Sequence, residues 1–280
     1  MSKTAGRVLL ITGVSSGFGR ALSEAALNAG HTVIGTVRSK AAKIEFDGLN
    51  EARAHGVILD VTDFAAIETS INEITQRTGP VDVLVNNAGY GHEGTLEESP
   101  IEELVRQFNV NVFGAVAMTK AVLPSMRVRR AGHIINITSM AGLVTFPGVS
   151  YYCGSKFALE GISEALEKEV RGFGIKVTIV APGSFRTDWA GRSMVRTERS
   201  VDDYDAVFEP IRLARKAKDG RQAGDPVKAA QVLLDLMEDD NPPVHLLLGN
   251  DALSVVRKKL TGLSDEIDAW ESVSKSTDFS

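Results

Sequence analysis

Short apolar runs alternate with longer segments of helical periodicity along most of the chain. The short runs are rich in valine, isoleucine and leucine, which is typical of parallel strands buried on both faces of a sheet. They lie at residues 8–12, 32–37, 57–60, 81–86, 133–139, 176–181 and 244–248. The longer segments repeat apolar residues every three or four positions, as helices packed along one face do. They lie at residues 17–29, 63–77, 101–130, 152–172 and 226–237.

This β-α-β-α order predicts a Rossmann-type, doubly wound α/β fold. Each crossover between parallel strands is right-handed and lays its helix against the sheet, so the helices cover both faces of about seven strands. Neither a linker nor a change of composition interrupts the pattern, and we therefore expect a single domain over residues 1–280.

Two segments do not fit the alternation. Residues 188–224 join a strand to the next helix, although such connections usually take about two to six residues. Their position after the carboxyl end of a strand favours a lid over a ligand, and a solvated helical excursion is the alternative. Residues 251–280 have the pattern of a helical tail, and we expect Trp270 to pack it onto the body.

A glycine-rich turn joins the first strand to the first helix. In its sequence, TGVSSGFG, the glycines allow the backbone to turn tightly and to approach a pyrophosphate at the helix N-terminus. The alternative is a tight turn with close helix packing. Because the turn follows the first strand of a β-α-β series, it predicts a dinucleotide site. The expected contacts are Gly13, Ser15, Ser16, Gly17, Phe18 and Gly19.

The end of the second strand indicates which dinucleotide binds. An acidic side chain there bonds the ribose 2′-hydroxyl of NAD, whereas an arginine accommodates the 2′-phosphate of NADP. The chain has Arg38 and Lys40 and no acid, so NADP(H) is favoured over NAD(H). Arg38 is the better candidate because a guanidinium both stacks on adenine and meets phosphate. Asp60, at the end of the third strand, is a candidate for the adenine edge.

A tyrosine and a lysine at the start of the helix at 152–172 carry the candidate chemistry. Tyr152 and Lys156 are four residues apart and share a helix face. A phenol has a pKa of about 10, and a fixed ammonium beside it moves that pKa toward neutrality. The alternative is a pair of neighbours on an amphipathic helix. Ser139 ends the preceding strand, so a substrate oxygen between Ser139 and Tyr152 would accept two hydrogen bonds.

Charge and composition exclude several other classes. The net charge of −5 argues against a nucleic-acid binder. No apolar run reaches the roughly 18 to 20 residues of a membrane helix, and we expect a soluble, cytoplasmic protein without membrane contact. Cys153 is the only cysteine, which excludes an intrachain disulfide. No metal-ligand spacing is present, and His92 is expected in an exposed loop or, alternatively, in the substrate pocket.

Six ordered motifs resemble the short-chain dehydrogenase/reductase family. They are TGVSSGFG, NNAG, NVFG, the strand-end Ser139, YCGSK, and Pro182-Gly183 followed by Thr187. The resemblance runs from residue 7 to 187 and continues loosely to 248. Within the family, the TVR and YCGSKFALEG segments are most similar to the branch of the 17β-hydroxysteroid dehydrogenases.

The resemblance implies a role for each matching residue. Tyr152 would be the general acid/base, Lys156 would lower its pKa and bond the nicotinamide ribose, and Ser139 would orient the substrate oxygen. Asn111 would kink its helix and hold a water that links Lys156 to solvent. Thr187 would bond the nicotinamide carboxamide. The remaining implied cofactor contacts are Asn87, Ala88, Gly89, Pro182 and Gly183.

These observations together predict an NADP(H)-dependent oxidoreductase that interconverts a ketone or aldehyde and an alcohol. Apolar residues expected at the pocket favour a bulky apolar substrate. They are Leu143, Val144, Phe146, Trp189, Met194 and Phe208. The alternative is an NADP-binding redox sensor without turnover. A nucleotide-sugar epimerase or dehydratase shares the Tyr-x-x-x-Lys pattern but usually has a longer chain. The resemblance also implies a homodimer or homotetramer formed through residues 101–130 and 152–172.

Overall fold

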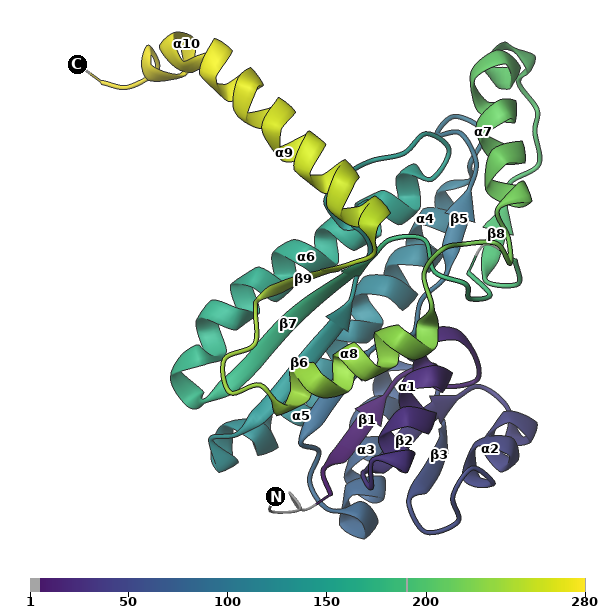
Figure 1. Cartoon of the computed structure of the whole chain (residues 1–280), viewed down its shortest axis with the longest axis vertical. Coiled ribbons are helices and arrows are strands. Elements are labelled where there is room, and N and C mark those ends of the chain that lie inside the picture. The colour runs from purple at the N-terminus through teal and green to yellow at the C-terminus, as the bar shows by residue number, and fades with distance from the viewer. Residues whose placement is uncertain (1–5, 190, 280) are drawn as a thin grey trace.

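Seven parallel strands form the central sheet of the computed structural model, which describes residues 6–189 and 191–279 (Figure 1). The strand order is β3-β2-β1-β4-β6-β7-β9, and the predicted doubly wound α/β fold is confirmed. The strands are β1 (Val8–Ile11), β2 (Thr32–Val37), β3 (Ala54–Ile58), β4 (Val83–Asn86), β6 (Gly132–Ile137), β7 (Ile175–Pro182) and β9 (His245–Leu248).

Helices cover both faces of this sheet. One face carries α1 (Gly17–Asn28), α2 (Lys40–Asp47) and α8 (Pro226–Glu238), and the other carries α3 (Phe64–Thr78), α5 (Ala115–Arg129) and α6 (Ser150–Val170). Successive side chains of a strand point to opposite faces. Accordingly, Leu9 and Ile11 of β1 join the core under α1 and α8, whereas Leu10 joins the core under α3 and α5.

Local structure departs from the expected pattern in two places. The helix α2 lies in a segment to which the sequence pattern assigned no element, and Ser39 caps it by accepting a hydrogen bond from the Ala42 N–H at 3.2 Å. The long helix expected at 101–130 is divided into α4 (Ile101–Phe108), a π-helical turn (Asn109–Gly114) and α5. Because π-turns bend helices, the turn around Asn111 redirects this segment.

Residues 188–224, which we call the insertion, dock onto the edge of the body through a small second sheet. Within it lie β8 (Met194–Arg196) and α7 (Asp205–Ala217), and β8 pairs in parallel with β5 (Gly91–Glu93). His92 of β5 is 1% exposed, its Nε2 lies 2.8 Å from Thr197 Oγ1, and its ring stacks on Tyr151. The expectation of an exposed or pocket-lining histidine is therefore wrong, because pairing with β8 buries this side chain.

A phenylalanine from α7 fastens the insertion to the loop that precedes α6. Phe208 is 3% exposed and covers Gly148, where an added Cβ would lie 1.9 Å from the Phe208 ring. The guanidinium of Arg199 lies 5.1 Å from the centroid of this ring and pairs with Glu98 at 3.0 Å. The insertion is thus held by this buried aromatic contact in addition to the β5–β8 pairing, and by ion pairs to Glu98 and Glu93.

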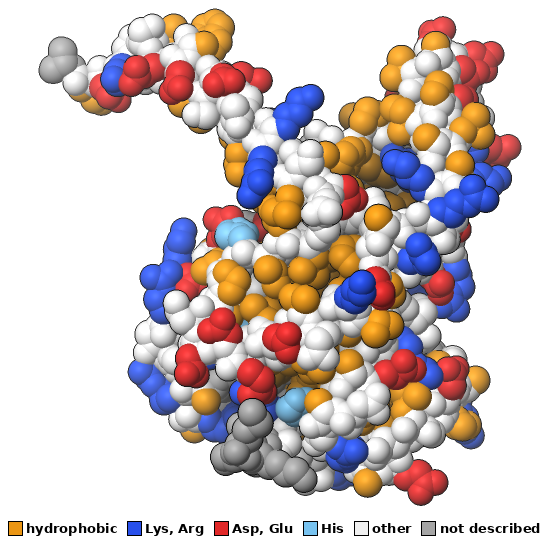
Figure 2. All heavy atoms as spheres, in the orientation of Figure 1, with side chains coloured by type: hydrophobic (Ala, Val, Ile, Leu, Met, Phe, Trp, Pro, Cys, Tyr) orange, Lys and Arg blue, Asp and Glu red, His pale blue; other side chains and the backbone are white. Residues whose placement is uncertain are grey.

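The C-terminal segment projects away from the body as an arm, formed by α9 (Asn250–Ala269) and α10 (Glu271–Lys275) (Figure 1). Trp270 is 65% exposed, so the expectation that it packs onto the body is wrong. Ala252 and Val256 are the buried residues of α9, and apolar side chains appear along the exposed arm in Figure 2. Over the residues that the structure describes, no helix combines the length and hydropathy of a membrane span.

We expect Phe208→Ala to loosen the insertion. Removing a buried phenylalanine typically costs about 3–5 kcal/mol, which corresponds to at least ~100-fold faster amide exchange across α7 when that helix opens locally. Hydrogen–deuterium exchange of peptides from 194–217 measures the change. The matched control is Leu213→Ala, since Leu213 of α7 is 56% exposed. Equal exchange in the two variants would contradict this account of how the insertion is held.

Candidate active site

A cleft of about 1120 Å³ opens at the carboxyl ends of the strands. The strand order reverses between β1 and β4, and doubly wound sheets bind ligands at such a reversal. Most residues singled out from the sequence line this cleft. They are Gly13, Ser15, Ser16, Gly17, Phe18, Arg38, Asp60, Asn87, Ala88, Gly89, Ser139, Tyr152, Lys156, Pro182, Gly183 and Thr187.

The glycine-rich turn forms the floor of the cleft between β1 and α1. Gly13 and Gly17 have φ values of 72° and 58°, a region that side chains with a Cβ rarely adopt. Gly19 does not line the cleft, because it faces the turn itself: an added Cβ would lie 2.3 Å from the Gly13 carbonyl oxygen. Asn87 Nδ2 donates to the carbonyl oxygens of Thr12 and Gly13, at 2.8 and 3.0 Å. Asn87 therefore fixes the turn from the neighbouring strand.

The far end of the cleft is formed by residues after β2 and β3. Arg38 is exposed there, and α2 begins two residues later behind its Ser39 cap. Asp60 is already engaged locally, because its Oδ1 accepts hydrogen bonds from the backbone N–H and the hydroxyl of Thr62 at 2.9 and 2.7 Å. The arrangement leaves a guanidinium, and not a carboxylate, beside the end of β2.

Ser139, Tyr152 and Lys156 converge on the opposite part of the cleft. Ser139 follows β6, and its hydroxyl lies close enough to the Tyr152 phenol to act on the pKa of that phenol. Lys156 lies one helical turn after Tyr152 on α6, with its Nζ 5.8 Å from the Tyr152 ring centroid. That Nζ donates to the Ile137 carbonyl oxygen at 2.8 Å, which fixes the ammonium below the phenol.

Burial is the largest cause of the pKa shifts of Tyr152 and Lys156. It raises the pKa of Tyr152 to about 12, and the nearby Ser139 side chain acts in the opposite direction. Burial also lowers the pKa of Lys156 to about 8, which Glu160 partly opposes. We expected Lys156 to lower the pKa of Tyr152, but desolvation of the phenol outweighs any such effect in this structure.

Asn111 lies behind the cleft and joins three segments. Its Oδ1 accepts from the Tyr90 N–H, and its Nδ2 donates to the Tyr90 carbonyl oxygen and to Ser155 Oγ, all at 3.1 Å. An added Cβ on Gly89 would lie 3.1 Å from Asn111 Oδ1 and 3.7 Å from Lys156 Nζ. Asn111 and Lys156 therefore flank the same glycine.

The insertion supplies part of an apolar wall next to Tyr152. The Trp189 ring centroid lies 5.0 Å from that of Tyr152. Of the expected pocket residues, Phe146 and Trp189 line the cleft, whereas Met194 packs on Gly91 and Phe208 on Gly148. Leu143 and Val144 are also absent from its lining. Residues that spacing alone did not indicate complete the wall, namely Val149, Val195, Pro210 and Ile211.

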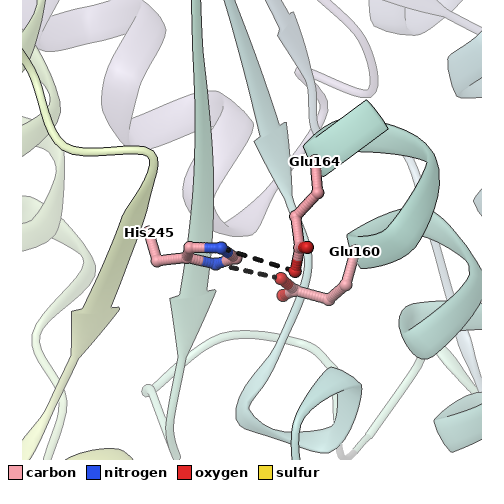
Figure 3. A group of neighbouring side chains, drawn as sticks. All are labelled: Glu160, Glu164 and His245. Atoms are coloured by element: carbon pink, nitrogen blue, oxygen red, sulfur yellow. Dashed lines mark ion pairs between the residues drawn. The ribbon is translucent and has the colours of Figure 1, made fainter. Parts of the chain in front are cut away.

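A second polar group begins one turn beyond Lys156 along α6 and escaped the sequence argument (Figure 3). Glu160 Oε1 accepts from Thr138 Oγ1 at 2.5 Å, and its Oε2 lies 3.4 Å from His245 Nδ1. Glu164 Oε1 lies 3.5 Å from His245 Nε2. The four-residue spacing of the glutamates was visible in the sequence, but the sequence did not indicate that His245 of β9 lies beside them.

The ligand atoms of these three residues lie within 4.8 Å of one another, close enough to hold a metal ion. The contacts of His245 with the two glutamates account for the same geometry without a metal, so the expectation of no metal stays a prediction. Burial raises the pKa of Glu160 to about 7. The hydrogen bond from Thr138 is the next largest influence and lowers this pKa, and the smaller effect of the Glu164 charge raises it.

Comparison with protein families gives a match over residues 7–197 to the model described as short chain dehydrogenase. Oxidoreductase BOA17 of Botryotinia fuckeliana is 35% identical over 96% of this chain and 98% of its own. A 3-ketodihydrosphingosine reductase of Bacteroides thetaiotaomicron is 36% identical over 93% and 94%. An NADPH-dependent 3-dehydrocapnine reductase of Ornithobacterium rhinotracheale is 35% identical over 80% and 81%.

Solved structures show the same similarity. A short-chain dehydrogenase from Streptomyces avermitilis superposes with a TM-score of 0.92 and is 42% identical, over 99% of this chain and 100% of that one. A family member from Burkholderia phymatum in complex with NAD has a TM-score of 0.78 at 26% identity, over 92% and 94%. ElxO with NADP bound has a TM-score of 0.72 at 27% identity, over 89% and 99%.

We expect Glu160→Gln to change how stability depends on pH. A carboxyl whose pKa is raised from 4.5 to about 7 stabilises the fold fully below pH 4.5, and that contribution is lost as pH rises through 7. The glutamine of the variant cannot ionise. The free energy of unfolding of the variant should therefore rise relative to that of the wild type over this interval, by up to about 1.4 kcal/mol per unit of pKa difference. Denaturant titrations between pH 4.5 and 8 measure the free energy of unfolding.

Glu169→Gln is the control, because Glu169 lies exposed on the same helix. Its stability should follow the wild-type pH profile. If Glu160→Gln also follows the wild-type profile, the buried carboxyl does not titrate in this range.

Proposed function

This chain belongs to the short-chain dehydrogenase family and is an oxidoreductase, and from that premise we propose that it reduces the carbonyl of a bulky apolar ketone or aldehyde with NADPH. The observation that carries the proposal is the convergence of Ser139 and Tyr152 in one cleft, with Lys156 fixed below the phenol. Two hydroxyl donors at one point suit a carbonyl oxygen that gains negative charge during reduction.

The residues along the cleft fit a dinucleotide. Gly13 and Gly17 leave the backbone open for a pyrophosphate at the start of α1, and Arg38 offers a cation where NADP carries its 2′-phosphate. Among the related proteins, one is named for NADPH dependence, and the solved structures include complexes with NADP and with NAD. Arg38, together with the lack of an acid after β2, supports NADP(H). The nicotinamide would supply the hydride.

The protein's own contribution is to hold and transfer a proton. With its pKa raised to about 12, Tyr152 carries its proton at neutral pH, which is the state that donates to a substrate oxygen. This supports reduction as the direction of the reaction. Lys156 and Asn111 flank Gly89, and we assign them the proton supply that restores Tyr152 after each turnover.

The substrate side of the cleft favours a long apolar group. Phe146, Val149 and Trp189 surround the approach to Tyr152, and the insertion contributes Val195 and Ile211. One relative is named as a reductase of 3-ketodihydrosphingosine, a ketone. We propose that the insertion acts as the lid over a substrate of this chemical kind.

Tyr152→Phe should abolish most turnover while it leaves nucleotide binding intact. Loss of proton transfer typically lowers kcat by about 10²–10⁴-fold, and the phenyl ring keeps the packing against Trp189. NADPH oxidation across a panel of aliphatic and aromatic ketones measures turnover, and calorimetry measures nucleotide binding. Full activity in the variant would remove Tyr152 from the mechanism. Wild-type protein that binds NADPH but reduces no carbonyl would favour the redox-sensor alternative.

Arg38→Gln should weaken NADPH binding selectively. A hydrogen bond to a charged group contributes about 1.5–3 kcal/mol, so the Kd for NADPH should rise roughly 10- to 100-fold while that for NADH changes little. Titration of both nucleotides by fluorescence gives the ratio. Lys40→Gln serves as the comparison, because it removes the other cation that follows β2, at the first residue of α2. A ratio that stays at the wild-type value in Arg38→Gln would refute the assignment.

A further inference from the structure

Apolar residues form a continuous stripe along α9. Leu253, Val256, Leu260, Leu263, Ile267 and Trp270 alternate spacings of three and four residues. This is the spacing of core positions in a coiled coil, where two helices pack along one seam. The stripe therefore has the pattern of a helix–helix interface.

The body of the protein covers only the beginning of this stripe. Val256 is buried, but every described residue from 257 to 279 is exposed. Leu260, Leu263, Ile267 and Trp270 are 59%, 41%, 60% and 65% exposed. Helices of globular proteins owe most of their stability to packing of an apolar face, and short helices alone in water are marginal. The outer part of α9 has the composition of a packed helix without a packing surface in the monomer.

Charges beside the stripe are segregated by sign. Arg257 and Lys259 adjoin it near the body, whereas Glu266 and Glu271 adjoin it toward the tip. Figure 2 shows the same gradient, with basic side chains at the base of the arm and mainly acidic ones along its outer part. Two copies of α9 packed in parallel would place like charges together. Packed antiparallel, the basic end of each copy meets the acidic end of the other.

We propose that α9 pairs antiparallel with α9 of a second copy of this chain, through the stripe from Leu260 to Trp270. A two-fold axis across the middle of the helix makes both ends of the contact equivalent, as a self-complementary interface requires. The pairing buries the exposed apolar side chains, and each contact between Arg257 or Lys259 and the acidic end of the partner helix occurs twice. This interface is separate from the helices at 101–130 and 152–172.

The first experiment replaces apolar residues of the stripe. Leu263→Asp and Ile267→Asp should each halve the molar mass of the assembly in sedimentation or light scattering, because a charge enters the seam. The control is Ile44→Asp, since Ile44 is a 63% exposed residue of α2, far from α9 along the chain. It should keep the wild-type mass. Circular dichroism and nucleotide binding confirm that each variant is folded.

The second experiment tests orientation by charge. Glu266→Lys/Glu271→Lys makes both ends of α9 basic, and Arg257→Glu/Lys259→Glu makes both ends acidic. Each variant alone should be at least ~10-fold weaker in self-association than the wild type at low salt. An equimolar mixture of the two should form a heterodimer, because opposite charges again face each other. A variant that had merely misfolded would not be rescued by mixing.

Three results would overturn the proposal. They are a monomeric wild type, stripe variants with wild-type mass, and charge variants that fail to associate when mixed although each is folded. The first two would show that the stripe does not join copies of the chain. The third would exclude the antiparallel orientation.

Discussion

Parallel pairing of all the strands in the main sheet is the constraint on which the candidate site depends. It brings the carboxyl ends of β1, β4 and β6 to one edge, although the residues that follow them are far apart in the chain. Gly13, Asn87 and Ser139 become neighbours of one cleft for this reason. The fixed hand of the crossovers then places α6 beside that edge, so that Tyr152 meets Ser139.

Burial in the cleft shifts the pKa values of Tyr152 and Lys156. Desolvation favours the neutral form of each, and it therefore moves their pKa values apart, to about 12 for Tyr152 and about 8 for Lys156. A proton on Tyr152 is retained, while one on Lys156 is held less tightly than in water. The bonds from Lys156 to Ile137 and from Asn111 to Ser155 fix the geometry in which these tendencies act.

The sequence was sufficient for the features that local rules determine. Strand composition and helical periodicity predicted the sheet and most helices, and the glycine spacing placed the turn under the cleft. Prediction from the sequence failed where a segment distant in the chain determines the surroundings of a residue. Pairing with β8 buries His92, β9 brings His245 to Glu160, and the absence of a covering surface leaves Trp270 in solvent. Met194 and Phe208 were expected at the substrate pocket, but they pack on Gly91 and Gly148 and do not line the cleft.

The way the insertion is attached has an evolutionary consequence. Its anchors are peripheral, namely β8 beside β5 and Phe208 on Gly148, whereas Trp189, Val195 and Ile211 line the cleft. The residues assigned to hydride and proton chemistry all precede it in the chain. Substitutions within 191–224 can therefore change which substrates are accepted without altering the residues that carry out the reaction. Related enzymes can in this way diverge in substrate range while they keep the same chemistry.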